Sequence, residues 1–321
     1  MVAKLPTVAV ITPVYNGERF LRETMLSVQA QTYPNLVHFV LDNASTDRTP
    51  DIIREFAGGR VPVKVERNAA LLHVARNWNR CVELGSQGSD YFRILCADET
   101  IAPDGIEKSV AVAETDPLIS VVGCGHTTTY GLEDLHWDRT RSVFSGVEAT
   151  RLCLTGQCGL APSHLLYRTS VLSLRDKLFE EGSQHFDTEA AFFLLTRENA
   201  RFGFVHDPVG FSHRHAASLS STIAAVLHTD FLEWFTIVER YAGTVLTPEA
   251  LRKYKRSYKR HYYGRMLAWK YLRGNSKAFE WHRQALASIG AAPTVWAYAD
   301  AVADYGLRQM GLRKRWNQYP F

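Results

Sequence analysis

The sequence predicts an α/β fold with a mostly parallel sheet, followed by a helical C-terminal part. Two observations on the 321-residue chain support this prediction. Short apolar runs with β-branched residues alternate with stretches of helical periodicity over roughly the first 125 residues, as in parallel sheets with crossover helices. Beyond about residue 220, long helical patterns dominate. We therefore expect two domains, residues 1–220 and residues 221–321.

The first 47 residues contain the predicted centre of the sheet. Residues 8–11 and 37–41 are apolar runs typical of buried strands, and residues 20–28 between them present one apolar helix face. A strand, a helix and a second strand at this spacing form a βαβ unit with parallel strands. Ligands of such sheets bind beyond the carboxyl ends of the strands. Residues 13–16 and 42–47 occupy those ends.

The later elements continue the alternation. Thr49-Pro50 indicates a helix start, since proline is favoured at the first helical position. Thr247-Pro248-Glu249 indicates another helix start in the C-terminal part. The remaining predicted elements are strands at residues 61–66, 91–96 and 119–124, and helices through residues 77–85 and from about residue 185.

Composition limits the class of protein. The net charge is +4 and 46% of the residues are apolar, which supports a large core and does not indicate nucleic-acid binding. Five cysteines without a paired pattern suggest buried thiols rather than disulfides. No run approaches 18 apolar residues and no signal peptide is recognisable. We expect a cytoplasmic protein, with peripheral binding to the inner face of the membrane left open, and a homo-oligomer also left open.

Residues 252–273 form a basic amphipathic helix. Aromatic residues and one methionine recur at steps of three or four, and lysines and arginines occupy the other faces. The favoured interpretation is a helix packed on the domain of residues 1–220 with a solvated basic face. The alternative is docking on anionic lipid or on a lipid-pyrophosphate acceptor. Nucleic acid is disfavoured, because no base-reading module accompanies the helix.

The chemistry-bearing residues lie where predicted strands end. The chain lacks the glycine-rich GxGxxG fingerprint after its first strand, so a dinucleotide loop is excluded there. The apolar residues 91–95 lead to the adjacent acids Asp98 and Glu99. Neighbouring carboxylates repel each other unless a cation neutralises them, and a hard divalent ion bridging a diphosphate would do so. It would also neutralise charge on a leaving nucleoside diphosphate.

These stretches resemble the family 2 glycosyltransferases, which have an A-type nucleotide-sugar fold with a Rossmann-like sheet. The matching residues are Thr12-Pro13-Val14-Tyr15-Asn16, Gln31-Thr32-Tyr33-Pro34-Asn35 and Leu41-Asp42-Asn43-Ala44-Ser45-Thr46-Asp47. The resemblance implies that Asp42 contacts the nucleobase. It also implies that Pro13, Tyr15 and Asn16 line the base and ribose pocket. The alternative for Asp42 is a turn cap.

The resemblance extends to the metal motif of the family. There, an Asp-any-Asp motif binds a divalent ion, Mn²⁺ or Mg²⁺. Here Cys96 stands at the first Asp position, Ala97 and Asp98 follow, and Glu99 comes next. The resemblance implies that Asp98 and Glu99 hold metal and that Ala97 and Asp98 line the donor site. Cys96 is a poor ligand for a hard ion, so metal dependence is expected to be looser than usual.

Further donor-site residues follow from the same resemblance. Asn68 and Arg76 fall in a segment that passes under the nucleotide, and Arg76 has a surface salt bridge as an equal alternative. In residues 213–220, a histidine followed three positions later by serine matches a family pattern in which the histidine binds metal or diphosphate. His215 fits that position.

The catalytic base is expected at the start of the helix near residue 185. Sugar transfer needs a group that takes the proton from the acceptor hydroxyl. The resemblance implies an acid in this turn, where negative charge is favoured at a helix N-terminus. Glu189 is the predicted base and Asp187 the alternative, and both could instead only cap the helix.

These residues together predict an inverting, metal-dependent glycosyltransferase. It would move a sugar from a nucleoside diphosphate sugar, with UDP favoured, to a hydroxyl of a glycan or lipid-linked acceptor in surface polysaccharide synthesis. One alternative is a catalytically impaired nucleotide-sugar-binding or membrane-scaffold protein of the same fold. Another is a nucleotidyltransferase, but residues 12–16 do not form the glycine-rich, basic phosphate loop expected of one.

Overall fold

The computed structural model describes residues 5–133, 135–183, 185–215, 226–310 and 312. The chain divides into two compact units, residues 1–153 with 158–214 and residues 154–157 with 215–321. The predicted boundary at residue 220 lies outside the described residues. Each unit is described by itself below.

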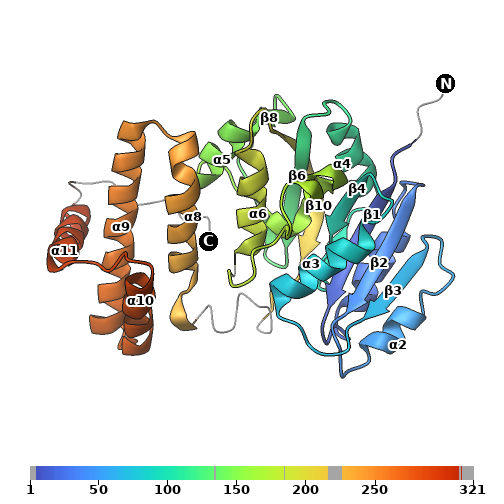
Figure 1. The fold of residues 1–321 in the computed structure, drawn as a ribbon, viewed down its shortest axis with the longest axis horizontal. Coiled ribbons are helices and arrows are strands. Elements are labelled where there is room, and N and C mark those ends of the chain that lie inside the picture. The colour runs from blue at the N-terminus through green and yellow to red at the C-terminus, as the bar shows by residue number, and fades with distance from the viewer. Residues whose placement is uncertain (1–4, 134, 184, 216–225, 311, 313–321) are drawn as a thin grey trace. The chain divides into compact units, whose positions relative to one another are not determined.

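A single large sheet forms the centre of the first unit (Figure 1). Its strand order is β3-β2-β1-β4-β9-β6-β10-β5, with β7 beside β6 and β8 beside β10. The strands are β1 (Val8–Val14), β2 (Leu36–Asp42), β3 (Val63–Arg67), β4 (Tyr91–Ile94), β5 (Glu99–Ile101), β6 (Ile119–Thr128), β7 (Gly131–Glu133), β8 (Val143–Ser145), β9 (Leu166–Arg168) and β10 (Arg201–Ser212).

The strand directions confirm the predicted α/β class. Strands β3, β2, β1 and β4 run parallel to one another, and β6 runs parallel to β10. Strand β9 is antiparallel to both β4 and β6, and β5 is antiparallel to β10. The sheet is therefore mixed in its second half, where short strands return without a crossover helix.

Helices connect the strands of the first unit. They are α1 (Leu21–Gln29), α2 (Thr49–Arg54), α3 (Val74–Gly85), α4 (Gly105–Ala113), α5 (Gly146–Leu154) and α6 (Phe186–Leu195), with short 3₁₀ turns η1 (Pro162–His164) and η2 (Thr169–Ser173). The predicted helix start at Thr49-Pro50 is confirmed to within one residue, since Arg48 occupies the N-cap position.

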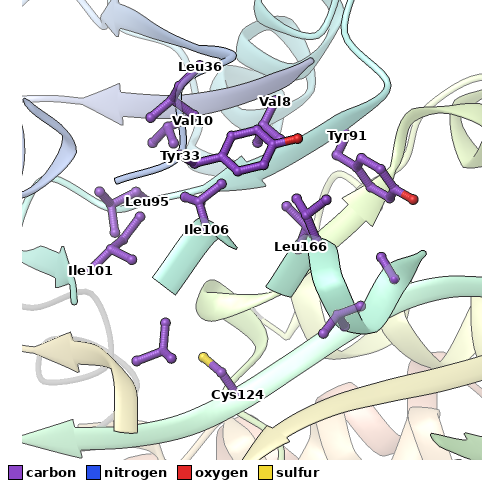
Figure 2. Packing of buried hydrophobic residues seen from close by; sticks show 14 of the residues in the cluster. Val8, Val10, Tyr33, Leu36, Tyr91, Leu95, Ile101, Ile106, Cys124 and Leu166 are labelled. Atoms are coloured by element: carbon purple, nitrogen blue, oxygen red, sulfur yellow. The ribbon is translucent and has the colours of Figure 1, made fainter. Parts of the chain in front are cut away.

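The core explains why the strands read as continuous apolar runs. Every residue of β1 is buried, as expected for a strand covered on both faces. Figure 2 shows one part of this core, in which Val8, Val10 and Leu166 pack together with Tyr33 and Tyr91. All five cysteines are free thiols, and Cys96 is the one that is not fully buried.

The second unit contains a long helix packed against three others (Figure 1). These are α8 (Asp230–Val245), α9 (Pro248–Tyr271), α10 (Ser276–Ser288) and α11 (Val295–Gln309). The predicted helix start at Thr247 is confirmed, because its side chain accepts a hydrogen bond from the Ala250 amide. No described helix combines the length and apolar composition that a membrane crossing needs.

The aromatic stripe of residues 252–273 is buried inside this unit. Tyr258 donates a hydrogen bond to the Phe231 carbonyl at 2.6 Å, and Trp269 stacks on His282. Several cations of α9 pair with acids; Arg260, for example, donates two hydrogen bonds to Asp300. The apolar face of α9 thus packs against the other helices of its own unit.

Candidate active site

Strand register brings three chain segments together at one edge of the sheet. Val14 pairs with Asp42, and Asp42 pairs with Arg67, at the carboxyl ends of β1, β2 and β3. The buried Asp42 carboxylate accepts hydrogen bonds from Arg67 at 2.7 Å and from the Ser45 amide at 2.9 Å. Arg67 also donates to the Ser45 carbonyl. Asp42, the predicted nucleobase contact, therefore forms an ion pair in which its own carboxylate is buried and the Arg67 side chain is half exposed.

Arg67 was not among the sequence-predicted site residues. The available signal was its position directly after a predicted strand that neighbours the strand ending at Asp42. Beside the pair lies a pocket of about 260 Å³. Its lining is mainly apolar and comes from β3, α2 and the turn after α2: Pro50, Ile53, Arg54, Ala57, Val63 and Val65, together with Asp42 and Arg67.

The turn after β1 is tied to the turn after β2. Asn16 has a positive φ of 50°, a left-handed conformation that asparagine tolerates better than most residues. Its side chain accepts a hydrogen bond from the Thr46 amide at 2.9 Å, and its own amide donates to the Ser45 hydroxyl. Pro13 is buried within β1, whereas Tyr15 is exposed at the rim. Tyr15 and Asn16 are both exposed, and the Asn16 side-chain oxygen is engaged by the Thr46 amide.

Asn68 links the end of β2 to α3 through hydrogen bonds. Its amide donates to the Asp42 carbonyl at 2.8 Å, and its side chain donates to Asn43 and Asn77 at 2.8 Å each. Arg76, one turn into α3, is exposed and lines a different, polar pocket of about 520 Å³ with Arg80 and others. The structure thus separates Arg76 from the pocket that contains Asp42.

The acids that follow β4 have different environments. Asp98 is half-buried, whereas Glu99 is buried and accepts hydrogen bonds from Ser163 at 2.6 Å, Ser212 at 2.9 Å and the Cys96 amide at 3.0 Å. Burial, and next the charge of Asp98, raise the pKa of Glu99 to about 7. Both Glu99 oxygens are already engaged with the protein.

Glu99 belongs to a buried polar network that sequence reasoning did not find. The Ser212 hydroxyl lies 3.0 Å from a ring nitrogen of His164 and 3.0 Å from one of His126. The other His164 ring nitrogen lies 3.0 Å from the fully buried Arg93. Burial, and next the Arg93 charge, hold the pKa of His164 well below its usual range, so this ring is neutral. The network joins β4, η1, β6 and β10 behind Asp98.

Asp187, at the start of α6, converges with the acids after β4. Burial raises the pKa of the Cys96 thiol well above its ordinary value, and the charges of Glu99, Asp98 and Asp187 raise it further. The Asp187 carboxylate is therefore within electrostatic range of Cys96, although 91 positions separate them in the sequence. Burial also raises the pKa of Asp187 itself. One Asp187 oxygen accepts a hydrogen bond from the Thr188 amide at 2.6 Å.

Glu189 is held differently. Its buried carboxylate accepts two hydrogen bonds from Arg175, at 2.7 Å and 3.1 Å. Arg175 also donates to the Leu178 carbonyl and lies over the Phe193 ring. This bidentate pair fastens the start of α6 to the segment of residues 175–178. Arg175 was not identified from the sequence, because a pair 14 residues apart across a loop has no periodic signal.

The donor set suits a metal ion that takes most of its ligands from substrate and water. Among the described residues, no group of three or more His, Cys, Asp or Glu side chains forms a cation site. Because both Glu99 oxygens are engaged and burial raises the pKa of the Cys96 thiol, these two side chains are poor ligands for a hard ion. Mg²⁺-type sites commonly use one or two carboxylates together with substrate phosphates. His215 is half-buried and is the first residue of the second unit, so it stays a candidate by sequence position.

Comparison with known proteins identifies the family of this chain. The profile of Glycosyl transferase family 2 matches residues 9–174. EpsE of Bacillus subtilis is 34% identical over 121 residues, which are 37% of this chain and 43% of EpsE. The chain thus spans less than half of that relative's length.

Solved structures share the fold. Residues 1–349 of S. aureus TarS, solved with UDP-GlcNAc, have a TM-score of 0.72 at 16% identity, covering 96% of this chain and 93% of that one. The mannosyltransferase PcManGT from Pyrobaculum calidifontis, in complex with GDP-Man and Mn²⁺, has a TM-score of 0.57 at 18% identity, covering 98% and 83%. With a family profile that matches more than half of its length, this chain belongs to glycosyl transferase family 2.

Proposed function

We propose that this protein transfers a sugar from a nucleoside diphosphate sugar to an acceptor hydroxyl, with inversion at the anomeric carbon. The proposal is supported by the position of Asp98 and Glu99 directly after β4, together with an Asp187 charge near enough to contribute, with theirs, to the raised pKa of the Cys96 thiol. Support for the donor class comes from the fold neighbours, which were solved with UDP-GlcNAc and with GDP-Man.

Asp42 and Arg67 are the proposed readers of the nucleobase. Each Asp42 oxygen accepts one hydrogen bond in the structure, which leaves lone pairs for a ligand N–H. The guanidinium beside it can donate to a ligand carbonyl. An acceptor next to a donor matches a base that carries an N–H beside a carbonyl, as uracil and guanine do and as adenine and cytosine do not. This pattern is compatible with a UDP-sugar or a GDP-sugar, and we propose UDP as the favoured nucleotide of the donor.

Asp98 is the proposed protein ligand of a divalent ion, Mn²⁺ or Mg²⁺, that would neutralise negative charge on the departing nucleoside diphosphate. The chain's own residues position this carboxylate. The Asp98 carbonyl accepts a hydrogen bond from the His213 amide at 3.0 Å, and Glu99 anchors the adjoining turn. We keep His215 as a candidate second ligand. Glu99 is better suited to holding the turn than to binding metal, because both of its oxygens are occupied.

Asp187 is the proposed general base. It would take the proton from the acceptor hydroxyl while the acceptor oxygen attacks the anomeric carbon and the nucleoside diphosphate leaves from the opposite face. A raised pKa suits a group that must accept a proton. Glu189, the base favoured from residue order, has both oxygens bonded to Arg175 and would have to break a buried ion pair to react. Glu189 therefore remains the alternative.

The acceptor is proposed to be a glycan or a lipid-linked sugar in surface polysaccharide synthesis. The test is nucleotide release. Purified protein is incubated with UDP-sugars, and with GDP-, CDP- and ADP-sugars for comparison, in the presence of Mn²⁺ and of mono- and oligosaccharide acceptors. Acceptor-dependent release of UDP, with a product of inverted anomeric configuration by NMR, supports the proposal.

Two other results would contradict it. Stabilisation of the protein by UDP-sugars without release by any acceptor would point to a binding module. A product that retains the donor's anomeric configuration would exclude direct displacement with Asp187 as base, since retention requires a different course at the anomeric carbon.

A further inference from the structure

A second pocket lies between helix α3 and the segment that precedes α6. Its volume is about 520 Å³, within the range of about 300–1,000 Å³ that is typical of small-molecule sites. It shares no lining residue with the pocket that contains Asp42 and Arg67. Its lining comes from α3 and the turn before it (Leu72, Arg76, Asn79, Arg80 and Glu83) and from the segment before α6 (Lys177 and Glu181).

Buried contacts hold the two walls of this pocket together. The Asn79 side chain donates a hydrogen bond to the Phe179 carbonyl at 2.8 Å and accepts one from the Phe179 amide at 2.9 Å. Trp78, the preceding residue, packs edge-on against the rings of Phe179 and Phe186. The segment before α6 is therefore fixed against α3, and the pocket between them is a preformed feature of the first unit.

Three cations line the pocket without a partner in the protein. In the described part of the chain, no ion pair or side-chain hydrogen bond engages Arg76, Arg80 or Lys177. By contrast, Arg67 and Arg175 of the same unit each pair with a carboxylate. Arg76 and Arg80 lie four residues apart on α3, so they are neighbours on one helix face and repel each other. A bound anion would relieve this repulsion and would satisfy their N–H donors.

Two carboxylates complete the lining. Glu83 and Glu181 are exposed, and neither forms an ion pair with another described residue. An ionised carboxylate only accepts hydrogen bonds, so both suit the hydroxyl groups of a sugar. Guanidinium and ammonium groups suit a phosphate or a carboxylate instead. The mixture favours a ligand with hydroxyls and one anionic group over an extended anionic surface, which would repel both acids.

The pocket adjoins both parts of the candidate active site. The Asn43 side chain, directly after β2, donates to the Leu72 carbonyl and accepts from the Leu72 amide, at 2.9 Å each. On the other side, Phe186 contacts α3 through its ring and directly precedes Asp187. The pocket thus lies beside the chain segments that carry the proposed nucleotide contact and the proposed base.

We propose that this pocket is an acceptor subsite for an acidic sugar, one that carries a phosphate or a carboxylate. Arg76, Arg80 and Lys177 hold the anionic group. Glu83 and Glu181 accept hydrogen bonds from the sugar hydroxyls. The inference rests on the proposed function and narrows the acceptor from any glycan or lipid-linked sugar to an acidic one.

The first test measures binding and requires no turnover. Ligand-observed NMR titrations of the full-length protein compare glucose 1-phosphate, glucuronic acid and glucose, so the two acidic probes separate the two sources of negative charge. We expect at least one acidic probe to bind at least about tenfold more tightly than glucose, with an affinity that falls as salt is added. The variant Arg80→Gln/Lys177→Gln should weaken that binding about tenfold or more. It leaves Arg76 in place, so a contact of Arg76 with the donor does not affect the comparison.

The matched control is Lys64→Gln/Arg197→Gln. It removes the same two charged groups from exposed positions of the first unit that do not line this pocket. The control should bind the acidic probes like the unaltered protein. Thermal melts establish that both double variants are folded, which is expected because the altered side chains are exposed.

The second test measures transfer to an acidic acceptor and to its neutral counterpart. The ratio of the two kcat/KM values should fall at least about tenfold in Arg80→Gln/Lys177→Gln and stay unchanged in Lys64→Gln/Arg197→Gln.

The outcomes separate this inference from the proposed function. Binding of one acidic probe alone supports the inference and identifies the anionic group. Equal binding of glucose and both acidic probes, unchanged binding in Arg80→Gln/Lys177→Gln, or an equal loss in the control would overturn it. Failure of the proposed function would look different, because the acidic probes would still bind here while no acceptor released UDP.

Discussion

The two acids of helix α6 provide a sharp test of the site, because the structure places them in different environments. Asp187 is proposed to take the acceptor proton, and Glu189 is bound to Arg175. The variants Asp187→Asn and Glu189→Gln each replace a carboxylate by an amide of nearly equal size. They should therefore differ in which property they lose.

Asp187→Asn should lose catalysis and keep stability. General base catalysis contributes about 10²–10⁴-fold, which corresponds to a rise of roughly 3–5 kcal/mol in the activation barrier. We expect kcat to fall by that factor with KM for the donor little changed. The melting temperature should stay the same or rise, because burial of the Asp187 charge is unfavourable, as its raised pKa indicates.

Glu189→Gln should lose stability first. Removing one partner of a buried ion pair costs about 3–5 kcal/mol, and the lower figure applies because glutamine still accepts one hydrogen bond from Arg175. About 3 kcal/mol corresponds to a fall in Tm of roughly 6–12 °C for a domain of about 200 residues.

The assay is differential scanning fluorimetry beside steady-state UDP release, both at one pH and one metal concentration. A Glu189→Gln protein with unchanged Tm but no turnover, combined with normal turnover of Asp187→Asn, would refute this assignment. It would return the base to Glu189.

Other predictions test the remaining parts of the site. Asp98→Asn should lower kcat about 100-fold or more and weaken the response of activity to Mn²⁺, whereas excess chelator should suppress the unaltered enzyme; full activity in chelator would remove the metal from the account. Arg67→Ala should raise KM for the donor about tenfold. The control is Arg54→Ala, which should leave KM unchanged, because Arg54 lines the same pocket but pairs with Asp51. Equal effects of the two substitutions would argue against base recognition by the Asp42–Arg67 pair. Burial lowers the pKa of His38 to about 3 from 6.5, so between these pH values the unfolded chain binds a proton that the folded chain excludes. The free energy of unfolding should therefore fall, by up to about 5 kcal/mol, as the pH drops from 6.5 toward 3. His38→Gln should flatten this acid-side loss in urea titrations while the exposed His73→Gln should not; parallel curves for all three proteins would show that another group controls it.

The elements of the sheet could be predicted because their signals are local. Buried strands such as β1 and β2 are continuous apolar runs, and the polar residues at their ends mark where they stop. The ends of parallel strands share one edge, so the grouping of residues 13–16 with residues 42–47 followed from topology. The register of Val14 with Asp42 agrees with that inference.

The pairings that shape the site could not be predicted in the same way. Glu99 meets Ser212 across 113 positions and Ser163 across 64 positions. Such contacts depend on how distant segments such as β5 and β10 pair, and no periodic pattern in the sequence predicts that pairing. The same holds for Arg175, which pairs with Glu189 and lies in a segment without regular structure. The orientation of helix α11 was difficult to predict for a further reason. Its charged residues face inward, whereas the usual rule places the charged face of a helix in solvent.

The most direct test of the central claim is a crystal of the protein grown with UDP and Mn²⁺, with diffraction data collected for manganese anomalous scattering. The account predicts a manganese peak bound directly to an Asp98 carboxylate oxygen and to the diphosphate, with uracil hydrogen-bonded to Asp42 and Arg67. It also predicts that the Asp187 carboxylate faces the space where the sugar would lie. Manganese and UDP bound elsewhere, or Asp187 turned away from the β-phosphate, would contradict it.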